Sequence, residues 1–481
     1  MAASDSRNTP HILAIPFPTD DQLAPFLNFS YLLASHGLSI TLLTTDPNSP
    51  PFQNVMVRAE YAGLNIRLLH MPFPVSPDIP EKSFTLLVYA FRSLADPIER
   101  WLQQQTEALP VTCIVSDFYL GWTQTLAAKA KIPRFVIHST SAFGVCVDNS
   151  LWTHLPHLAV RTDDEPFQVP DLAVDLSLCR KRIPWSARLF QKFDPVSEFT
   201  RENRLLNLQS HGIVVNTFYD LELLHINKLH ETTGKPVWAV GPILQHPMAD
   251  DHQSENVQRW LDSREPRSVL YVCLSNYALS AVQMTALARG LEELNTPFVW
   301  VVDGNEVSDE FEERVRDRAL VIQRGEAPQQ ALVLSHPSVG GFMTRCGWNS
   351  ALASITTGVP MITWPVEGDQ FSNSALVVEL LKIGVQVWEG EDGTPSRDRV
   401  KSAVERVMGE GEEAQRALEL SVVAIKAIKE EEATRQSMEA FAEEIRNIAS
   451  AELPESHDSE TPDTEQSGEL TELNVKQGQE V

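Results

Sequence analysis

Short apolar runs that alternate with helical stretches constrain the fold of this chain most strongly. In the first half, six such runs occupy residues 11–17, 38–45, 65–71, 113–118, 134–139 and 212–218. They are apolar throughout rather than at every second position, which is typical of parallel strands covered on both faces. This pattern predicts a doubly wound α/β domain that binds ligands at the carboxyl ends of its strands.

The same pattern restarts in the second half of the chain. Further strands are predicted at residues 268–274, 297–302, 319–323, 339–344 and 359–364. Between the halves, residues 240–255 carry prolines and acidic residues without a clear period, so we place a domain boundary there. We therefore expect a first domain over 1–245 and a second over 246–451, which closes with helices from about residue 397 to 448. The ligand site is expected in the cleft between them.

Composition excludes several classes of function. The net charge of -26 argues against nucleic acid and anionic membrane surfaces as partners. No stretch reaches the roughly 20 apolar residues of a membrane span, and the first ten residues do not form a signal peptide. A cytoplasmic protein is expected. Residues 452–481 are acidic and polar, which predicts a disordered tail.

Cysteine and histidine spacing predicts neither a disulfide framework nor a metal site. The five cysteines are scattered singly and are expected to be reduced thiols. The histidines form no HxxxH or HExxH pattern, so no metal is predicted.

Residues 325–370 carry the most specific motif of the chain. The pieces APQ, LSHPSVGGF, CGWNS, GVPMITWP and GDQ follow one another there. Together they resemble the signature box of plant family 1 UDP-glycosyltransferases. PHILAIPFP and IVSDFYLGWT also resemble that family, so the resemblance covers nearly the whole chain except the tail. It implies two facing Rossmann-like domains of the GT-B type, the first binding an acceptor and the second a UDP-sugar.

The resemblance also implies a catalytic histidine at the start of the first helix, oriented by an aspartate. Gln22 stands at the histidine position and Asp21 at the preceding glycine position. An amide has no basicity near neutral pH, and loss of a general base costs about 10²–10⁴-fold in rate. Asp117 is retained at the aspartate position. It either acts as a weak base after desolvation or bonds locally to the backbone.

His138 is the best remaining acid/base partner of Asp117 on the strand ends. The alternative is a partly buried histidine with a structural role.

Positions implied in donor binding divide into retained and substituted residues. The retained ones are Gln329, Trp348, Asn349, Ser350, Asp369 and Gln370, although a core role is the alternative for Trp348. The substituted ones are Glu326 for the tryptophan that stacks on uracil, Arg345 for a histidine, Ala353 for the glutamate that binds ribose, and Ser275 with Asn276 for a Gly-Ser pair. Arg345 keeps the ability to bind phosphate.

Three functions remain open at this point. The first is a degenerate glycosyltransferase, a pseudoenzyme that binds a small hydrophobic metabolite, phenolic or terpenoid-like, in the cleft. The second is an active but atypical glycosyltransferase that uses Asp117 and Arg345. The third is a repurposed isomerase or cyclase that uses acid/base groups and no donor.

We favour the first hypothesis, and a protein of that kind requires no cofactor. A UDP-sugar is needed only for the second, and no protein partner is indicated. The acceptor pocket is expected to be lined by loops of the first domain, such as residues 71–90 and 142–200.

Overall fold

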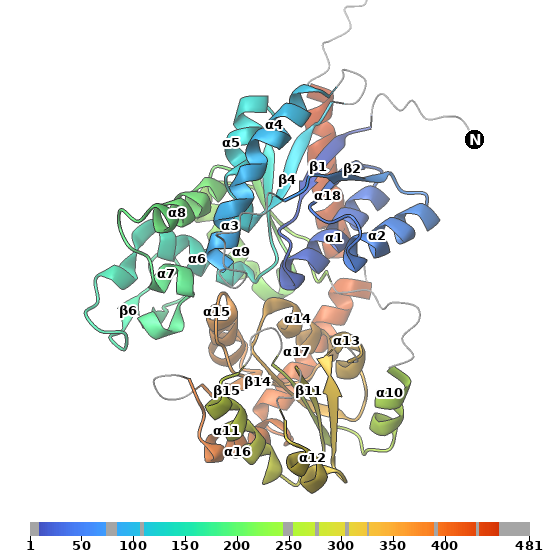
Figure 1. Ribbon diagram of the computed structural model, residues 1–481, viewed down its shortest axis with the longest axis vertical. Coiled ribbons are helices and arrows are strands. Elements are labelled where there is room, and N and C mark those ends of the chain that lie inside the picture. The colour runs from blue at the N-terminus through green and yellow to red at the C-terminus, as the bar shows by residue number, and fades with distance from the viewer. Residues whose placement is uncertain are drawn as a thin grey trace, which may run out of the picture.

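Two parallel β-sheets, each flanked by helices, form the body of the protein. The computed structural model describes residues 9–73, 84–105, 110–243, 254–274, 279–303, 307–324, 327–388, 393–429 and 432–451. In Figure 1 the first sheet with its helices lies above the second along the long axis of the molecule. The expected α/β class with two doubly wound domains is confirmed.

The first sheet has the strand order β3-β2-β1-β4-β5-β8-β9, and all its neighbouring strands are parallel. Its strands are β1 (His11–Ile15), β2 (Ser39–Thr44), β3 (Ile66–His70), β4 (Cys113–Asp117), β5 (Arg134–His138), β8 (Gly212–Val215) and β9 (Val237–Ala239). Its helices are α1 (Asp20–Ser35), α2 (Pro50–Tyr61), α3 (Phe84–Phe91), α4 (Ala95–Gln103), α5 (Thr123–Ala130), α6 (Ala142–His154), α7 (Trp185–Arg188), α8 (Pro195–Asn207) and α9 (Tyr219–Thr233). The strand order reverses between β1 and β4, which is where sheets of this kind open a binding crevice.

The second sheet has the order β12-β11-β10-β13-β14-β15 and is also parallel. Its strands are β10 (Val269–Cys273), β11 (Phe298–Val302), β12 (Ala319–Gln323), β13 (Val339–Thr344), β14 (Met361–Thr363) and β15 (Gly384–Gln386). The helices of this half are α10 (Ser254–Asp262), α11 (Ala281–Glu292), α12 (Asp309–Val315), α13 (Gln330–Leu334), α14 (Trp348–Thr357), α15 (Gln370–Ala375), α16 (Arg397–Val407), α17 (Glu412–Lys429) and α18 (Glu432–Ala451).

Every strand predicted from the sequence is present, with ends that differ by a few residues. The central strands are buried on both faces, which explains their continuous apolar sequence. Strands β9 and β15 and the two-residue hairpin of β6 (Phe167–Gln168) and β7 (Ser177–Leu178) were not predicted. They are too short to give a periodic signal. Most of the predicted linker, at 244–253, and the predicted tail at 452–481 lie outside the described residues.

Helix α18 follows the helices of the second domain but packs on the first. Phe441 on α18 contacts the rings of Phe135 and Trp238, with centroid distances of 5.0 and 5.1 Å. The expected second domain, 246–451, therefore contains a helix that completes the core of the first. The sequence identifies α18 as amphipathic, but periodicity does not reveal which sheet such a helix covers.

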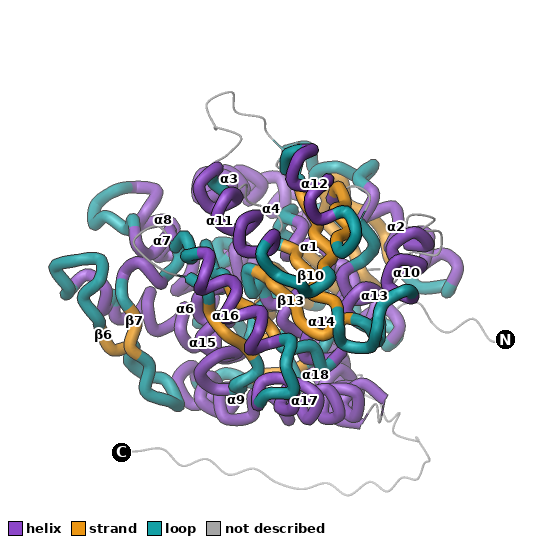
Figure 2. Tube along the Cα trace, turned by 90° about the horizontal axis from the view of Figure 1, so that it is seen from below, coloured by secondary structure: helices purple, strands orange, loops and turns teal. Residues whose placement is uncertain are grey.

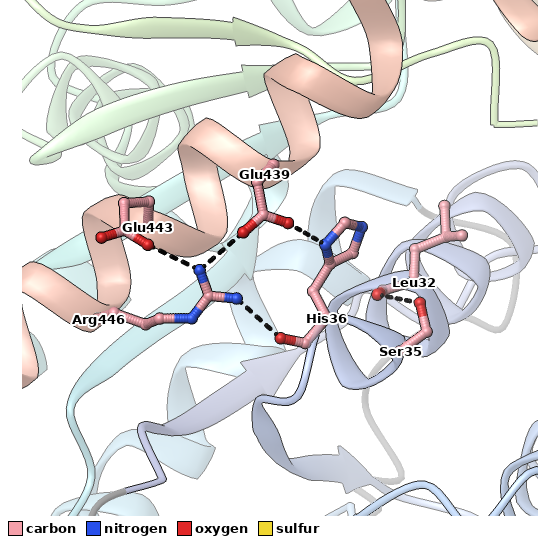
Figure 3. Close-up of polar contacts among 6 residues, drawn as sticks. All are labelled: Leu32, Ser35, His36, Glu439, Glu443 and Arg446. Atoms are coloured by element: carbon pink, nitrogen blue, oxygen red, sulfur yellow. Dashed lines mark hydrogen bonds and ion pairs between the residues drawn. The ribbon is translucent and has the colours of Figure 1, made fainter. Parts of the chain in front are cut away.

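Polar contacts fix the outer side of α18 to the end of α1 (Figure 3). The imidazole Nδ1 of His36 lies 2.8 Å from the carboxylate of Glu439. Arg446 donates hydrogen bonds to Glu439, to Glu443 and to the backbone carbonyl of His36, at 2.8–2.9 Å. The first helix, α1, and the last described helix, α18, are therefore joined by apolar and polar contacts at once.

Candidate functional site

A cavity of about 460 Å³ lies where the carboxyl ends of the two sheets meet. Its walls come from segments that follow β1, β4 and β5 in the first sheet and β13 and β14 in the second. Among its lining residues are Asp21, Gln22, Tyr119, Trp348, Asn349, Ser350, Asp369 and Gln370. Gln22 from the first half of the chain and five retained donor positions from the second half are thus brought together.

Gln22 occupies the wall of this cavity in the first turn of α1. Its backbone N–H donates to the carbonyl of Thr19, the N-cap residue of the helix, at 3.0 Å. The side-chain oxygen Oε1 is buried and accepts no hydrogen bond within the described part of the chain. The position implied for the general base therefore faces the cleft, but it presents an amide that cannot take a proton near neutral pH.

Asp117 ends strand β4 and is fully buried. Its Oδ1 accepts a hydrogen bond from the backbone N–H of Tyr119 at 2.8 Å, which caps the short helical turn at 118–120. Its Oδ2 has no hydrogen-bond partner among the described residues. Burial raises the pKa of Asp117 to about 7, although the Tyr119 N–H and the charges of Arg204 and Arg134 oppose the shift. The carboxyl group is absent from the lining of the cleft cavity.

His138 ends the neighbouring strand β5 and is also buried. Its ring stacks on Phe118 with a centroid distance of 5.1 Å. Burial lowers the pKa of His138 to about 3, and the positive charges of Arg204 and Arg134 lower it further. The imidazole is therefore neutral at physiological pH. No hydrogen bond joins it to Asp117 within the described ranges, so these groups do not form a coupled acid/base pair.

A second, narrower cavity of about 80 Å³ extends into the first domain. It shares Phe84, Tyr119, Glu367, Gly368 and Asp369 with the cleft cavity, so the two cavities are adjacent. Its other walls include apolar side chains of α3, α6 and the segment around α7, such as Val88, Val145, Leu151, Ile183 and Trp185. These residues fall within the segments expected to form the acceptor pocket.

Arg204 places a buried positive charge against this second cavity. Its guanidinium lies 4.5 Å from the ring centroids of both Phe118 and Tyr119. One nitrogen, Nη1, is 3.7 Å from the carboxylate of Asp148 on α6. Sequence reasoning missed Arg204, because a single arginine on an amphipathic helix gives no signal. The sequence could have identified Tyr119, because it lies two residues after Asp117 in a motif that matches the family.

Two retained residues at the start of α14 donate hydrogen bonds to backbone carbonyls of the first domain. The indole N–H of Trp348 donates to the carbonyl of Asn216 at 2.6 Å, and Trp348 is 2% exposed. The amide of Asn349 donates to the carbonyl of Asp21 at 2.9 Å. These side chains, which begin helix α14, hold the two domains together across the cleft.

Asp369 and Gln370 are also engaged in contacts of their own. The hydroxyl of Thr140 in the first domain donates to Asp369 Oδ2 at 2.6 Å, and the amide of Asn373 donates to the same oxygen at 2.8 Å. Burial raises the pKa of Asp369. The side-chain oxygen of Gln370 accepts from the backbone N–H groups of Val366 and Glu367 at 2.9 and 3.0 Å, which orders the loop before α15.

Two of the substituted donor positions, Arg345 and Ala353, belong to the described residues, and both lie away from the cleft cavity. Arg345 follows β13 and is 4% exposed. The hydrogen bond from Arg324 lowers the pKa of Asp303, and the charge of Arg345 makes a smaller contribution in the same direction. Ala353 is buried in the core on α14. Neither residue lines the cleft cavity. Gln329 is the N-cap residue of α13. Glu326, Ser275 and Asn276 lie outside the described residues.

The described ranges contain neither a candidate metal site nor a helix that could span a membrane. No group of three His, Cys, Asp or Glu side chains there is arranged to hold a metal ion. No helix in the same ranges is long and apolar enough to cross a bilayer.

Comparison with known proteins agrees with this architecture. The model of the family described as UDP-glucoronosyl and UDP-glucosyl transferase matches residues 241–426. A flavonol 3-O-glucosyltransferase of Arabidopsis thaliana is 35% identical over 93% of this chain and 99% of its own length. A scopoletin glucosyltransferase of Nicotiana tabacum is 34% identical over 92% of this chain and 98% of its own length.

Solved structures give the same assignment. A Glycyrrhiza uralensis glycosyltransferase complexed with glycyrrhetinic acid 3-O-monoglucuronide has a TM-score of 0.80 and 26% identity, covering 92% of this chain and 97% of that one. A Phytolacca americana glycosyltransferase complexed with UDP-2fluoro-glucose and pterostilbene has a TM-score of 0.77 and 27% identity, covering 92% of this chain and 100% of that one. With two Rossmann-like domains of the GT-B type and relatives of this kind along nearly its whole length, the chain belongs to plant family 1 of the UDP-glycosyltransferases.

Proposed function

We propose that this protein binds a small apolar metabolite, phenolic or terpenoid-like, in its cleft and has lost ordinary sugar transfer. The observation that carries the proposal is Gln22, an amide on the cavity wall at the position implied for the general base. Asp117, the retained partner of that base, is fully buried and does not line the cleft cavity. No general base therefore stands at the implied position to remove the proton from an acceptor hydroxyl.

The walls of the narrower cavity support an apolar aromatic ligand. Phe84, Phe118, Tyr119 and Trp185 line it together with aliphatic side chains. Such a pocket, with a few polar groups such as Arg204 and Thr140, is typical of small-molecule sites. Among the relatives, the solved proteins hold pterostilbene and a glucuronide of glycyrrhetinic acid. We extend that ligand class, but not the reaction, to this chain.

The retained donor-site residues already form hydrogen bonds within the protein, and this supports weak donor binding. Asn349 and Asp369 bond to the first domain, so a nucleotide sugar has to displace those contacts. Asp21 adds a carboxylate to the cavity wall, which repels a diphosphate. The substitutions at Glu326, Ala353 and Ser275-Asn276 remove further contacts that the family resemblance implies. Each lost contact is worth about 1 kcal/mol or more, so together they amount to about 3–5 kcal/mol, or several hundred-fold or more in affinity.

Titration calorimetry with UDP and UDP-glucose tests the donor half of this proposal. We expect dissociation constants weaker than micromolar, and binding of phenolic compounds in parallel titrations without UDP. Release of UDP from UDP-glucose with a panel of phenolic acceptors tests the reaction. Turnover of about 1 per second or faster, an ordinary enzyme rate, or micromolar affinity for UDP-glucose contradicts the proposal.

An active, atypical glycosyltransferase is the second candidate. The raised pKa of Asp117, about 7, is the observation that favours it, because a carboxyl of that pKa suits a general base. Transfer by this route should rise with pH through about 7 and should disappear in Asp117→Asn. Isomerase or cyclase chemistry has less support, because Asp117 and His138 are not hydrogen-bonded to each other.

A further inference from the structure

Helix α17 carries a row of exposed aliphatic side chains that the cleft does not use. Its inner face, with Ala417, Leu420, Ala424 and Ala427, is buried against α14 and α9. On its outer face, Leu418, Val422 and Ile425 are 45, 67 and 39% exposed. We call these three residues the α17 stripe. Figure 2 shows α17 along one edge of the molecule, beside α9 and α18.

The spacing of the stripe makes it a continuous surface. Residues four and three positions apart lie on the same side of a helix, so Leu418, Val422 and Ile425 form one ridge. Single exposed aliphatic residues are common on soluble proteins, whereas a contiguous row of them is a candidate contact surface. The row also has the 3–4 spacing by which two helices interlock side by side.

Two charges beside the stripe indicate what covers it. Glu419 and Lys426 lie seven residues apart, which is about two turns, and therefore on the same flank of the ridge. When two identical helices pack antiparallel about a two-fold axis, like flanks face each other. Glu419 of one copy then faces Lys426 of the other, and the same pair forms again on the opposite side of the axis.

We propose that the α17 stripe pairs with the same stripe of a second copy of this chain, in an antiparallel arrangement with two Glu419–Lys426 ion pairs. Glu419 now contacts Arg416 at 3.0 Å, with both side chains more than half exposed. Such a surface pair contributes little and is readily exchanged. One ridge of three side chains is smaller than the roughly 800 Å² per partner of a standard interface. The dimer should therefore be weak and reversible.

Analytical ultracentrifugation of the full chain at physiological ionic strength tests the dimer. We expect the average mass to rise with concentration through the micromolar range. Val422→Glu should raise the dimer dissociation constant by at least about tenfold, because it places like charges in the middle of the contact. Val282→Glu is the matched control, since Val282 is 65% exposed on α11, away from the stripe. It should leave the dissociation constant unchanged, and both variants should keep the wild-type circular dichroism.

A charge exchange tests the orientation. Glu419→Lys and Lys426→Glu should each weaken the dimer, because each places like charges opposite one another. The double variant should restore the wild-type dissociation constant, because it reverses both ion pairs. The proposal is overturned if the chain is monomeric at every concentration, if Val282→Glu weakens association as much as Val422→Glu, or if the double variant fails to recover. A stripe covered instead by a different protein would appear as the monomeric outcome.

Discussion

At the scale of single residues, Asp117 combines full burial with one oxygen that lacks a hydrogen bond. Burial disfavours the charged carboxylate, and the charges of Arg134 and Arg204 offset only part of that cost. An ordinary aspartate is ionised at neutral pH, whereas about half of Asp117 is protonated there. The raised pKa therefore lowers the stability of the folded protein as the pH increases.

Asp117→Asn should become stabilising relative to the wild type as the pH rises. The pKa of Asp117 is about 7 in the folded state and 3.8 as its ordinary value, so both states hold the proton only well below pH 3.8. Between pH 4 and 7 the unfolded chain loses it first, and folding stability falls by up to about 4 kcal/mol. The amide does not ionise, and its oxygen can still accept the Tyr119 N–H. Melting temperatures at pH 5 and pH 8 check this. A difference between variant and wild type that does not change with pH speaks against it.

Gln22→His alone should leave sugar transfer close to background. The imidazole supplies a base on the cavity wall, but the donor contacts remain engaged and Asp21 still faces the cavity. Binding and proton removal are separate requirements, so repair of one does not replace the other. UDP release from UDP-glucose, with Gln22→Asn as the control for a change of shape, measures the outcome. Ordinary enzyme rates from Gln22→His would show that the donor side is intact.

At the scale of elements, the start of α14 joins the domains through Trp348. Trp348→Phe removes the donor of the bond to Asn216 and leaves that buried carbonyl unpaired, which costs about 1–3 kcal/mol. Trp364→Phe is the matched control, because Trp364 is equally buried and its Nε1 bonds to nothing in the described ranges. Both variants lose ring volume, so the difference in unfolding free energy by urea isolates the hydrogen bond. Equal losses from the two substitutions would refute this role.

How far the sequence predicts each element depends on the kind of signal it carries. The strands of both sheets follow from apolar runs, because burial on both faces requires such runs. The positions of Gln22, Asp117 and Asp369 near the cleft follow from motifs at strand ends. The contact of Asp369 with Thr140 does not, because it joins residues 229 positions apart. Arg204 and the engagement of Asn349 are likewise set by packing between segments and leave no local pattern.

At the scale of the whole molecule, two kinds of contact connect the halves of the chain. Hydrogen bonds across the cleft join α14 and α15 to the first domain, and α18 enters the first core. Phe441→Ala should therefore destabilise the first domain by about 3–5 kcal/mol, because it opens a cavity between Phe29, Phe135 and Trp238. Urea unfolding followed by tryptophan fluorescence measures this. Val282→Ala, at an exposed site, should change stability by less than about 0.5 kcal/mol.

Because α18 packs in the first domain, that domain cannot complete its core during synthesis until the end of the chain has been made. Domains generally fold as they emerge, the N-terminal one first. Here the apolar faces of Phe29, Phe135 and Trp238 stay uncovered until residues 432–451 have been synthesised. The nascent first domain thus spends the translation of the entire second domain with part of its core open to water. A truncated message that lacks α18 would yield a chain whose first domain exposes apolar surface. Chaperones and proteases would recognise the chain by that exposed surface.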